Sequence, residues 1–514
     1  MPQFMHLLRR TDSAPTQRLS LQARWSALGS FVNIASRFLV GIVTARLLGP
    51  SGTGRLAYLF WIADTLCVVC GLGLQNTTAR FVADLNGQGL GVQAAALVRW
   101  LYERYLALML VTAALICLYM RFAISSREIR IWQVLVAYFL MQGLSIFYTA
   151  YLGGIKRFDI IARLNLTSSL VLLVVTTLGT VAYGTTGAVF GYFAGALPIA
   201  VLSLRLLWLP SGHERELENS LRNRCLKYAV FTWFAAIVTA IVWSRIEVFF
   251  LERYWNVHTV AMFTIGLTLS YLATQGPLLL TGPLMPHFAS LVGARNHDMI
   301  RSSYARFTRL LAAMLFPMCF GLASITPALL PLLYGKSFAP AVPAAMVLIV
   351  ISALSFANVG SALIYGMEKS FFIAVGGAAG AVLSLTSCML IIPRWGTLGA
   401  VCCRAGVQTS MILLGLWYIQ TRLLVPVPFR SLGKIILAAS VSAIPSYLIV
   451  RHYTSVFGIG LAIPIAICVY VAAARALHIL QLGDVELFES AFYGVHPFLQ
   501  KNVLQAVRWL SVGA

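Results

Sequence analysis

Five charged side chains fall inside long apolar stretches of the sequence and are the first candidates for chemistry. They are Arg37, Asp64, Arg245, Glu247 and Arg404. Placing such a charge at the centre of a membrane-spanning helix costs roughly 2.5–3.5 kcal/mol, so charges of this kind usually face a water-filled cavity or an opposite charge. We therefore expect these side chains to line a cavity or to form ion pairs inside the protein.

Arg37 has the pattern most typical of a binding residue. Asn33 lies four positions before it, which places both side chains on one face of a helix. An arginine guanidinium is planar, stays protonated and binds phosphate or carboxylate oxygens in pairs. The sequence thus predicts that Arg37 and Asn33 contact an anionic group of a ligand, and a structural ion pair between Arg37 and Asp64 is the alternative.

Each of the other charges allows two interpretations. Arg245 and Glu247 are two positions apart, so on a helix they point to different faces and do not pair with each other. We expect Arg245 and Arg404 to add to a cationic cavity, unless the helix that carries Arg404 begins after it. The carboxylates of Asp64 and Glu247 are candidates either for exchanging a proton or cation, or for ion pairs with arginines.

Glycine and proline are concentrated near the end of one apolar stretch. The residues are Gly276, Pro277, Gly282 and Pro283, and Pro286 follows shortly after. Proline removes a backbone donor and interrupts a helix, which a membrane tolerates where neighbouring groups or a water-filled cavity satisfy the freed carbonyls. We expect either a hinge or a static kink at this point.

Motifs of enzyme active sites are missing from the sequence. It contains no complete phosphate-binding loop, no HExxH pair and no GxSxG nucleophile turn. Cys67 and Cys70 have the spacing of a metal or redox pair, but no histidine is near them and their neighbours are apolar. We therefore expect no catalytic residue, no metal and no cofactor, and we do not expect an enzyme.

Composition shows what kind of elements must position these residues. The chain has 514 residues, of which 59% are hydrophobic and 11% charged, and its mean hydropathy is +0.83. A soluble domain carries about 25% charged residues. The sequence therefore predicts an all-α integral membrane protein with about fourteen apolar stretches long enough to span a bilayer: 25–47, 55–77, 100–122, 131–152, 160–183, 186–209, 228–251, 259–283, 309–333, 341–366, 370–393, 397–421, 433–450 and 457–478.

The longest polar stretch follows the sixth of these spans, so that six spans precede it and eight follow it. Transporters are often built from internal repeats, so we expect two six-helix lobes around a central cavity, followed by two further helices. The C-terminal residues mix apolar and polar side chains at helical spacing, which is typical of an amphipathic surface helix. The expected divisions are a cytoplasmic N-terminal tail (1–24), an N-lobe (25–209), a cytoplasmic linker (210–227), a C-lobe (228–425), spans 13 and 14 (433–478) and an amphipathic cytoplasmic tail (479–514).

The net charge of +22 raises the question of nucleic acid binding. The basic residues, however, lie in short connections between apolar stretches. About twice as many lysines and arginines fall in the even-numbered connections as in the odd-numbered ones. Cytoplasmic loops carry the excess of positive charge, so we expect a multi-pass protein with both termini inside the cell and no nucleic acid partner.

Four motifs in order resemble those of one transporter family. They are Thr44–Gly54, Gly71–Phe81, Met285–Ala289 and Leu333–Ala341. Polysaccharide transporters of the Wzx type carry similar sequences at the ends of spans one, two, eight and nine. The resemblance extends over roughly residues 20–425 and matches in span count.

This resemblance implies membership of the multidrug/oligosaccharidyl-lipid/polysaccharide exporter superfamily. Its implied function is an inner-membrane flippase that moves an exopolysaccharide or O-antigen repeat unit, carried on undecaprenyl diphosphate, to the outer face by alternating access. Arg37 and Arg245 would suit the carrier diphosphate. The implied partners are this lipid-linked oligosaccharide or exopolysaccharide intermediate and membrane lipid, with a polysaccharide polymerase and export machinery as further candidates.

Two related transporters and one enzyme class are the alternatives. Flippases for peptidoglycan precursors typically carry an Arg-Asp pair where this chain has Val40 and Gly41, which argues against that cargo. A multidrug or cation antiporter would be expected to have carboxylates deep in the N-lobe, for which Asp64 is the one candidate. A membrane-embedded polysaccharide assembly enzyme would normally show a sizeable loop outside the membrane, which this chain lacks.

Overall fold

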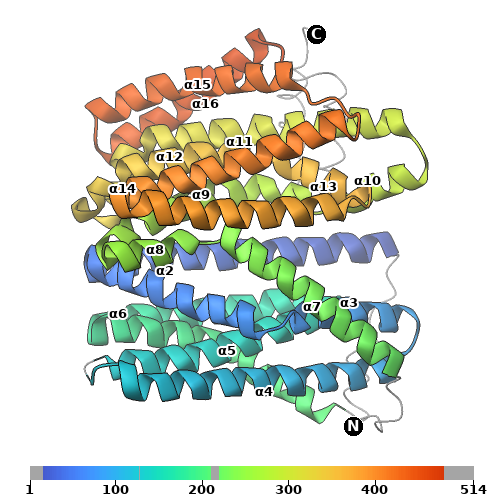
Figure 1. The fold of residues 1–514 in the computed structure, drawn as a ribbon. Coiled ribbons are helices and arrows are strands. Elements are labelled where there is room, and N and C mark those ends of the chain that lie inside the picture. The colour runs from blue at the N-terminus through green and yellow to red at the C-terminus, as the bar shows by residue number, and fades with distance from the viewer. Residues whose placement is uncertain (1–14, 127, 210–218, 480–514) are drawn as a thin grey trace. The chain divides into compact units, whose positions relative to one another are not determined.

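The computed structural model describes residues 15–126, 128–209 and 219–479 (Figure 1). Every regular element in these residues is an α-helix or a short 3-10 helix, so the prediction of an all-α protein is confirmed. The elements are α2 (Pro15–Cys70), α3 (Leu74–Gly87), α4 (Gly91–Ala123), α5 (Ile129–Gly154), α6 (Phe158–Ser203), η1 (Leu204–Trp208), α7 (Asn219–Val242), α8 (Ile246–Tyr254), α9 (Val257–Leu278), η2 (Leu279–Thr281), α10 (Leu284–Gly293), α11 (His297–Tyr334), η3 (Lys336–Ala341), α12 (Val342–Ser352), η4 (Ala353–Ala357), α13 (Asn358–Gly366), α14 (Ser370–Thr421), α15 (Phe429–His452) and α16 (Val456–Ala476).

Three of the helices are hairpins that each contain two membrane spans. Eleven helical segments in the described residues are long and apolar enough to cross a bilayer. The segments of α2, α6 and α14 reverse at Gly49, Gly184 and Gly396, whose φ angles are 65°, 58° and 52°. Glycine adopts such positive angles without the steric cost of a Cβ atom. Each hairpin adds one span, so the described residues contain fourteen spans, as predicted.

The helices form two compact units. The N-terminal unit comprises Met1–Leu47 and Leu59–Ile237, and the C-terminal unit comprises Leu48–Tyr58 and Val238–Ala514. The segment Leu48–Tyr58 includes the turn of the α2 hairpin, and Gly54 within it packs directly against the Val257 carbonyl of α9. In the C-terminal unit α15 and α16 lie side by side against α11 (Figure 1).

Small residues allow the two arms of the α6 hairpin to pack closely. Gly179 and Gly187 approach each other so tightly that a Cβ atom on either would overlap the backbone of the other, and Gly191 is packed in the same way against Thr176. Helices in a bilayer gain little from hydrophobic burial against each other, so close backbone packing contributes much of their association.

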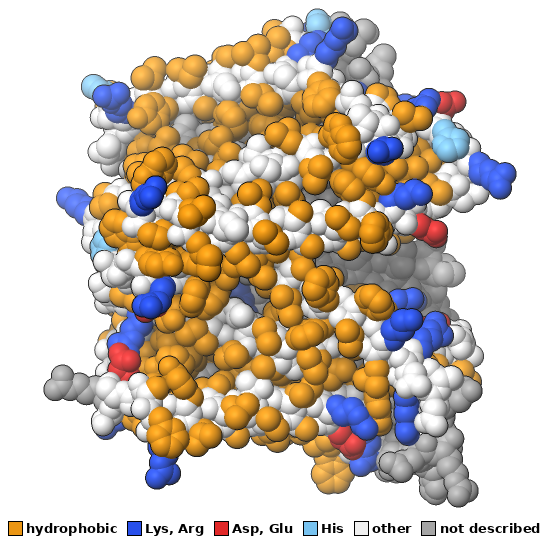
Figure 2. Space-filling model, viewed as in Figure 1, with side chains coloured by type: hydrophobic (Ala, Val, Ile, Leu, Met, Phe, Trp, Pro, Cys, Tyr) orange, Lys and Arg blue, Asp and Glu red, His pale blue; other side chains and the backbone are white. Residues whose placement is uncertain are grey.

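The outer surface of the helices is apolar, as a lipid-facing surface requires. On α4, Leu115 is 60% exposed and Phe122 is 79% exposed. Figure 2 shows apolar side chains over much of the visible face, whereas most lysines and arginines lie toward the ends of helices. This distribution fits a chain whose middle faces hydrocarbon and whose helix ends reach water.

The predicted span at 228–251 is not one continuous helix. Helix α7 ends at Val242, the backbone of Trp243–Arg245 is not helical, and α8 begins at Ile246. The glycine- and proline-rich stretch is interrupted as well, because α9 ends at Leu278 and passes through η2 before α10 begins at Leu284.

Parts of three predicted segments lie outside the described residues. These are residues 1–14 of the N-terminal tail, residues 210–218 of the linker and residues 480–514 of the amphipathic tail. Helix α7 begins at Asn219, inside the range predicted as linker.

The close packing of α6 predicts that Gly191→Ala destabilises the protein. The new Cβ would overlap Thr176 Cα and Oγ1, and overpacking of this kind costs about 1–3 kcal/mol. Thermal unfolding in detergent should show a lower Tm. Gly406→Ala in α14 is the matched control, because nothing lies within 4 Å of that position and alanine favours a helix more than glycine does. Equal or opposite effects of the two substitutions would contradict this packing.

Candidate functional site

Arg37 lines a cavity inside the N-terminal unit. The cavity has a volume of about 250 Å³ and is enclosed by α2, α5 and α6. Arg37 is exposed within α2, and its Nε donates a hydrogen bond of 3.1 Å to Asn33 Oδ1. The two residues that the sequence placed on one helix face therefore meet, and the amide holds the guanidinium in place.

Polar side chains from α5 and α6 complete the lining of this cavity. They are Tyr138, Gln142, Ser145, Thr149, Asn165, Ser168, Ser169 and Tyr192. The Ser168 hydroxyl is buried and has no hydrogen-bond partner among the described residues. The lining contains no carboxylate. An arginine with a neutral partner in a cavity of uncharged polar groups retains its attraction for an anion.

Asp64 does not take the position of a counter-ion in this lining. It is exposed on α2 and does not line the cavity. Tyr138, by contrast, belongs to the lining of the cavity. The ring of Tyr138 packs edge-on against Phe60 with centroids 5.2 Å apart.

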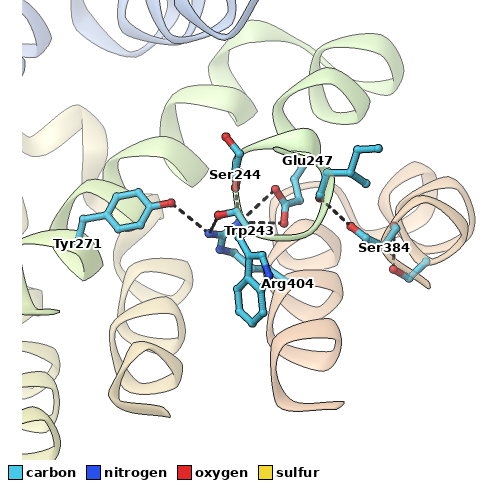
Figure 3. Close-up of polar contacts among 8 residues, drawn as sticks. Trp243, Ser244, Glu247, Tyr271, Ser384 and Arg404 are labelled. Carbon is cyan, nitrogen blue, oxygen red and sulfur yellow. Dashed lines mark hydrogen bonds and ion pairs between the residues drawn. The ribbon is translucent and has the colours of Figure 1, made fainter. Parts of the chain in front are cut away.

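In the C-terminal unit, Arg404 and Glu247 form a buried ion pair (Figure 3). Arg404 Nη1 lies 3.3 Å from Glu247 Oε1, and the two residues are 5% and 2% exposed. Arg404 comes from the second arm of α14 and Glu247 from the first turn of α8. A carboxylate in that turn is also stabilised by the positive end of the helix dipole.

The same guanidinium donates hydrogen bonds to backbone carbonyls at the break between α7 and α8. Nη1 of Arg404 donates to the Ser244 carbonyl at 2.6 Å, and Nη2 donates to the Trp243 carbonyl at 3.1 Å. Ser384 Oγ in the first arm of α14 donates to the Ile241 carbonyl at 3.4 Å. Unpaired carbonyls inside a bilayer cost several kcal/mol each, so these donors explain why the predicted continuous span can be interrupted here.

Arg245 lies close to this ion pair and is the residue that precedes α8. Its guanidinium carbon is 5.8 Å from the centroid of the Tyr271 ring. The Tyr271 hydroxyl accepts a hydrogen bond of 3.2 Å from Arg404 Nη2. The structure thus brings Arg245, Arg404 and Glu247 together around one tyrosine, and places Arg37 and Asn33 in the cavity of the N-terminal unit.

A larger cavity of about 430 Å³ adjoins Arg404 within the C-terminal unit. Residues from α7, α9, η4, α13 and α14 line it. Sequence reasoning missed its uncharged polar residues, of which Tyr271, Gln275 and Gln408 are examples. A signal was present, because Gln408 lies four positions after Arg404 and Gln275 four positions after Tyr271, which puts each pair on one helix face.

The glycine- and proline-rich stretch borders this cavity. Gln275 and Leu278 line it, and the predicted hinge residues Gly276 and Pro277 lie between them. Gly282 and Pro283 separate η2 from α10. Hinge movement of these residues remains a prediction.

Neither cavity offers a group of metal ligands. The described part of the chain contains no cluster of three or more histidine, cysteine, aspartate or glutamate side chains that could hold a metal ion. The polar residues of both cavities suit non-covalent binding through hydrogen bonds, to which the Arg37 guanidinium adds a positive charge.

Solved structures with the same fold are transporters. Lipid II flippase MurJ in an inward closed conformation aligns with a TM-score of 0.69 at 14% identity, over 88% of this chain and 98% of that chain. An inward-facing multidrug resistance MATE family transporter of the MOP superfamily aligns with a TM-score of 0.59 at 13% identity, over 77% of this chain and 98% of that one. A MOP superfamily transporter from Pyrococcus furiosus, described as having a binding pocket of reverse polarity, gives 0.54 at 14% identity, over 80% and 98%. At such identities the likeness establishes the fold.

The sequence itself gives the family. A comparison with curated protein sequences found no match. The sequence model of the polysaccharide biosynthesis protein family matches residues 43–343, which is more than half of the chain. This chain is therefore a multi-pass membrane protein that belongs to the polysaccharide biosynthesis protein family.

Proposed function

We propose that this protein is a flippase that moves a lipid-linked oligosaccharide across the cell inner membrane. The cargo would be an exopolysaccharide or O-antigen repeat unit on undecaprenyl diphosphate. The family match and the transporter fold support this class of activity. The single observation that carries the proposal is Arg37, a cation with an amide partner in a cavity that contains no carboxylate.

The chemistry of Arg37 suits the diphosphate of such a carrier. A guanidinium donates two parallel hydrogen bonds to phosphate oxygens and remains charged at any physiological pH. Tyr138, Gln142 and Asn165 supply further hydrogen-bonding groups around the same space.

The other two cations differ from Arg37 in their surroundings. Arg404 is neutralised by Glu247 and shared with two carbonyls, so we assign it to holding the α7–α8 break. The guanidinium carbon of Arg245 lies 5.8 Å from the centroid of the Tyr271 ring, and among the described residues Glu247 pairs with Arg404 and not with Arg245. It is the second candidate for contact with the carrier diphosphate.

Orientation and partners follow from the same proposal. Both termini would lie in the cytoplasm, because the even-numbered connections carry the excess of positive charge. Transport would proceed by alternating access, with Gly276, Pro277, Gly282 and Pro283 as hinge residues. Membrane lipid surrounds the spans, and a polysaccharide polymerase and export machinery would act on the delivered unit.

A multidrug or cation antiporter is the second candidate, since MATE transporters share the fold. It would use Asp64 or Glu247 as the coupling carboxylate. Asp64 lies on α2, the helix that also carries Arg37, which is the observation in its favour. The antiporter predicts that Asp64→Asn abolishes dye efflux, whereas the flippase predicts no dye efflux by the unsubstituted protein in the same vesicles.

Substitution of Arg37 tests the proposed cargo contact. In a host that lacks the gene, Arg37→Ala should reduce surface polysaccharide about tenfold or more, because one charge-assisted hydrogen bond pair is worth roughly 1.5–3 kcal/mol. Arg37→Lys should retain part of the output, since it keeps the charge and loses the planar fork. Arg121→Ala, at the exposed end of α4, should leave output unchanged. Full output from the Arg37→Ala variant would remove this residue from the site.

Substitution of Arg404 tests its assignment to the helix break. Arg404→Ala leaves Glu247 and two carbonyls without their donor, and removing one partner of a buried ion pair costs about 3–5 kcal/mol. Glu247→Gln removes the negative charge but keeps one oxygen acceptor, and the two carbonyls keep their donor, so the loss should be smaller. Thermal unfolding of the purified variants should rank Arg404→Ala below Glu247→Gln, and both below the unsubstituted protein. A lower Tm for Glu247→Gln than for Arg404→Ala would contradict this assignment, because the unbalanced charge would then cost more than the carbonyls left without a donor.

A further inference from the structure

The cavity of the C-terminal unit differs in charge from the Arg37 cavity. Arg404 is the one charged residue in its lining. Glu247 lies 3.3 Å from Nη1 of that guanidinium, and two carbonyls and the Tyr271 hydroxyl accept the other hydrogen bonds of Nη1 and Nη2. An anion entering this cavity would therefore meet a cation that is already neutralised. Binding here depends on uncharged groups.

The amides in this lining have no hydrogen-bond partner among the residues that the structure describes. Gln275, Asn358 and Gln408 come from α9, α13 and α14 and line the cavity. No hydrogen bond joins their side chains to other described residues, whereas Asn33 in the other cavity is engaged by Arg37. Each amide offers two donors and a carbonyl acceptor. Such groups in a cavity stabilise a ligand that itself carries both donors and acceptors.

Three hydroxyl groups in the lining can act only as hydrogen-bond acceptors toward a ligand, because their protons are already donated to backbone carbonyls. Ser270, Thr274 and Ser352 each donate to a carbonyl of their own helix, at 2.8, 3.2 and 2.7 Å. Each hydroxyl oxygen keeps lone pairs that can accept a hydrogen bond from a ligand hydroxyl. The lining thus contains amides that donate and accept, together with hydroxyls whose own protons are already used.

Two aromatic side chains add apolar faces to this polar lining. Trp243 and Tyr365 both line the cavity, and each is 42% exposed. Rigid aromatic rings present a flat apolar surface at low cost in conformational entropy. A pyranose ring has the matching chemistry, because its axial C–H bonds form an apolar face and its hydroxyls form a polar rim.

We propose that the C-terminal cavity is a glycan-binding site, which takes the neutral sugar residues of the cargo. Gln275, Asn358 and Gln408 hydrogen-bond the sugar hydroxyls, and Trp243 and Tyr365 stack on sugar rings. The site determines which glycan is accepted, while Arg37 in the N-terminal unit recognises the diphosphate common to all such carriers. This inference rests on the proposed function, and names the part of the substrate that the second cavity binds.

An apolar drug would fit this cavity less well than a glycan. Its entry would remove water from three amides without replacing their hydrogen bonds, at a cost of about 1–3 kcal/mol for each group. Discrimination of this kind is strong wherever a site is built to hydrogen-bond its substrate, since an analogue without hydroxyls leaves buried polar groups unpaired.

Two probes with the purified protein in lipid nanodiscs test the inference. The first is free glycan, released by mild acid hydrolysis from the lipid-linked oligosaccharides of the host. The second is undecaprenyl diphosphate without sugar. Gln408→Leu and Trp243→Ala should each weaken glycan binding about threefold to tenfold, the effect of one lost hydrogen bond or stacking contact, and leave binding of undecaprenyl diphosphate unchanged. Arg37→Ala should show the opposite pattern.

Controls separate the possible failures. Gln420→Leu, at an exposed position of the same helix α14, should leave both affinities unchanged. Retained binding of undecaprenyl diphosphate shows that a variant is folded, and Asn358→Leu replaces any variant that is not. Glycan binding that survives in all three cavity variants, or that is lost in Arg37→Ala alone, would overturn the glycan site and leave the flippase standing. If neither probe binds the unsubstituted protein, the proposed function fails, and the glycan site fails with it.

Discussion

The structure of the C-terminal unit depends on one guanidinium. A bilayer offers no water to backbone carbonyls, so a broken helix is stable there only if other groups donate to them. Arg404 donates to Trp243 and Ser244 at the end of α7 and forms an ion pair with Glu247 at the start of α8. One side chain thus bonds to backbone carbonyls after α7 and to a carboxylate in the first turn of α8. The broken span, the position of Tyr271 and the cavity beside it all follow from that arrangement.

This use of Arg404 makes the two cavities chemically different. Both contain an arginine and a ring of uncharged polar residues. In one, Arg37 has an amide as its partner, and in the other Arg404 is neutralised by a carboxylate. Counting cations alone would give both cavities the same preference for anions. Because Asn33 leaves the charge of Arg37 in place and Glu247 cancels that of Arg404, we assign the diphosphate to the first cavity and a neutral, hydroxyl-rich group to the second.

Features fixed by local sequence were predictable. The predicted spans leave short gaps at Gly49, Gly184 and Gly396, where the chain reverses and glycine accepts the positive φ angles of so tight a turn. The contact between Arg37 and Asn33 follows from a spacing of four residues.

Features that join distant parts of the chain were not predictable in this way. Arg404 and Glu247 are 157 positions apart, and no periodicity indicates that they meet. The interruption of α7 was missed for the same reason, since the donor that permits it lies on α14. Gln408 carries no charge and so did not stand out among apolar neighbours. The polar lining of the C-terminal cavity became visible only once α9, α13 and α14 were in place.

The central claim is that this chain carries lipid-linked oligosaccharide from the cytoplasmic to the outer leaflet. Its most direct test is to delete the gene in its host and determine in which leaflet the completed, lipid-linked repeat units accumulate. If the protein is this flippase, the repeat units accumulate on the cytoplasmic face and surface polysaccharide is lost. Repeat units that reach the outer leaflet in normal amounts but remain unpolymerised would contradict it, because the protein would then act after the crossing.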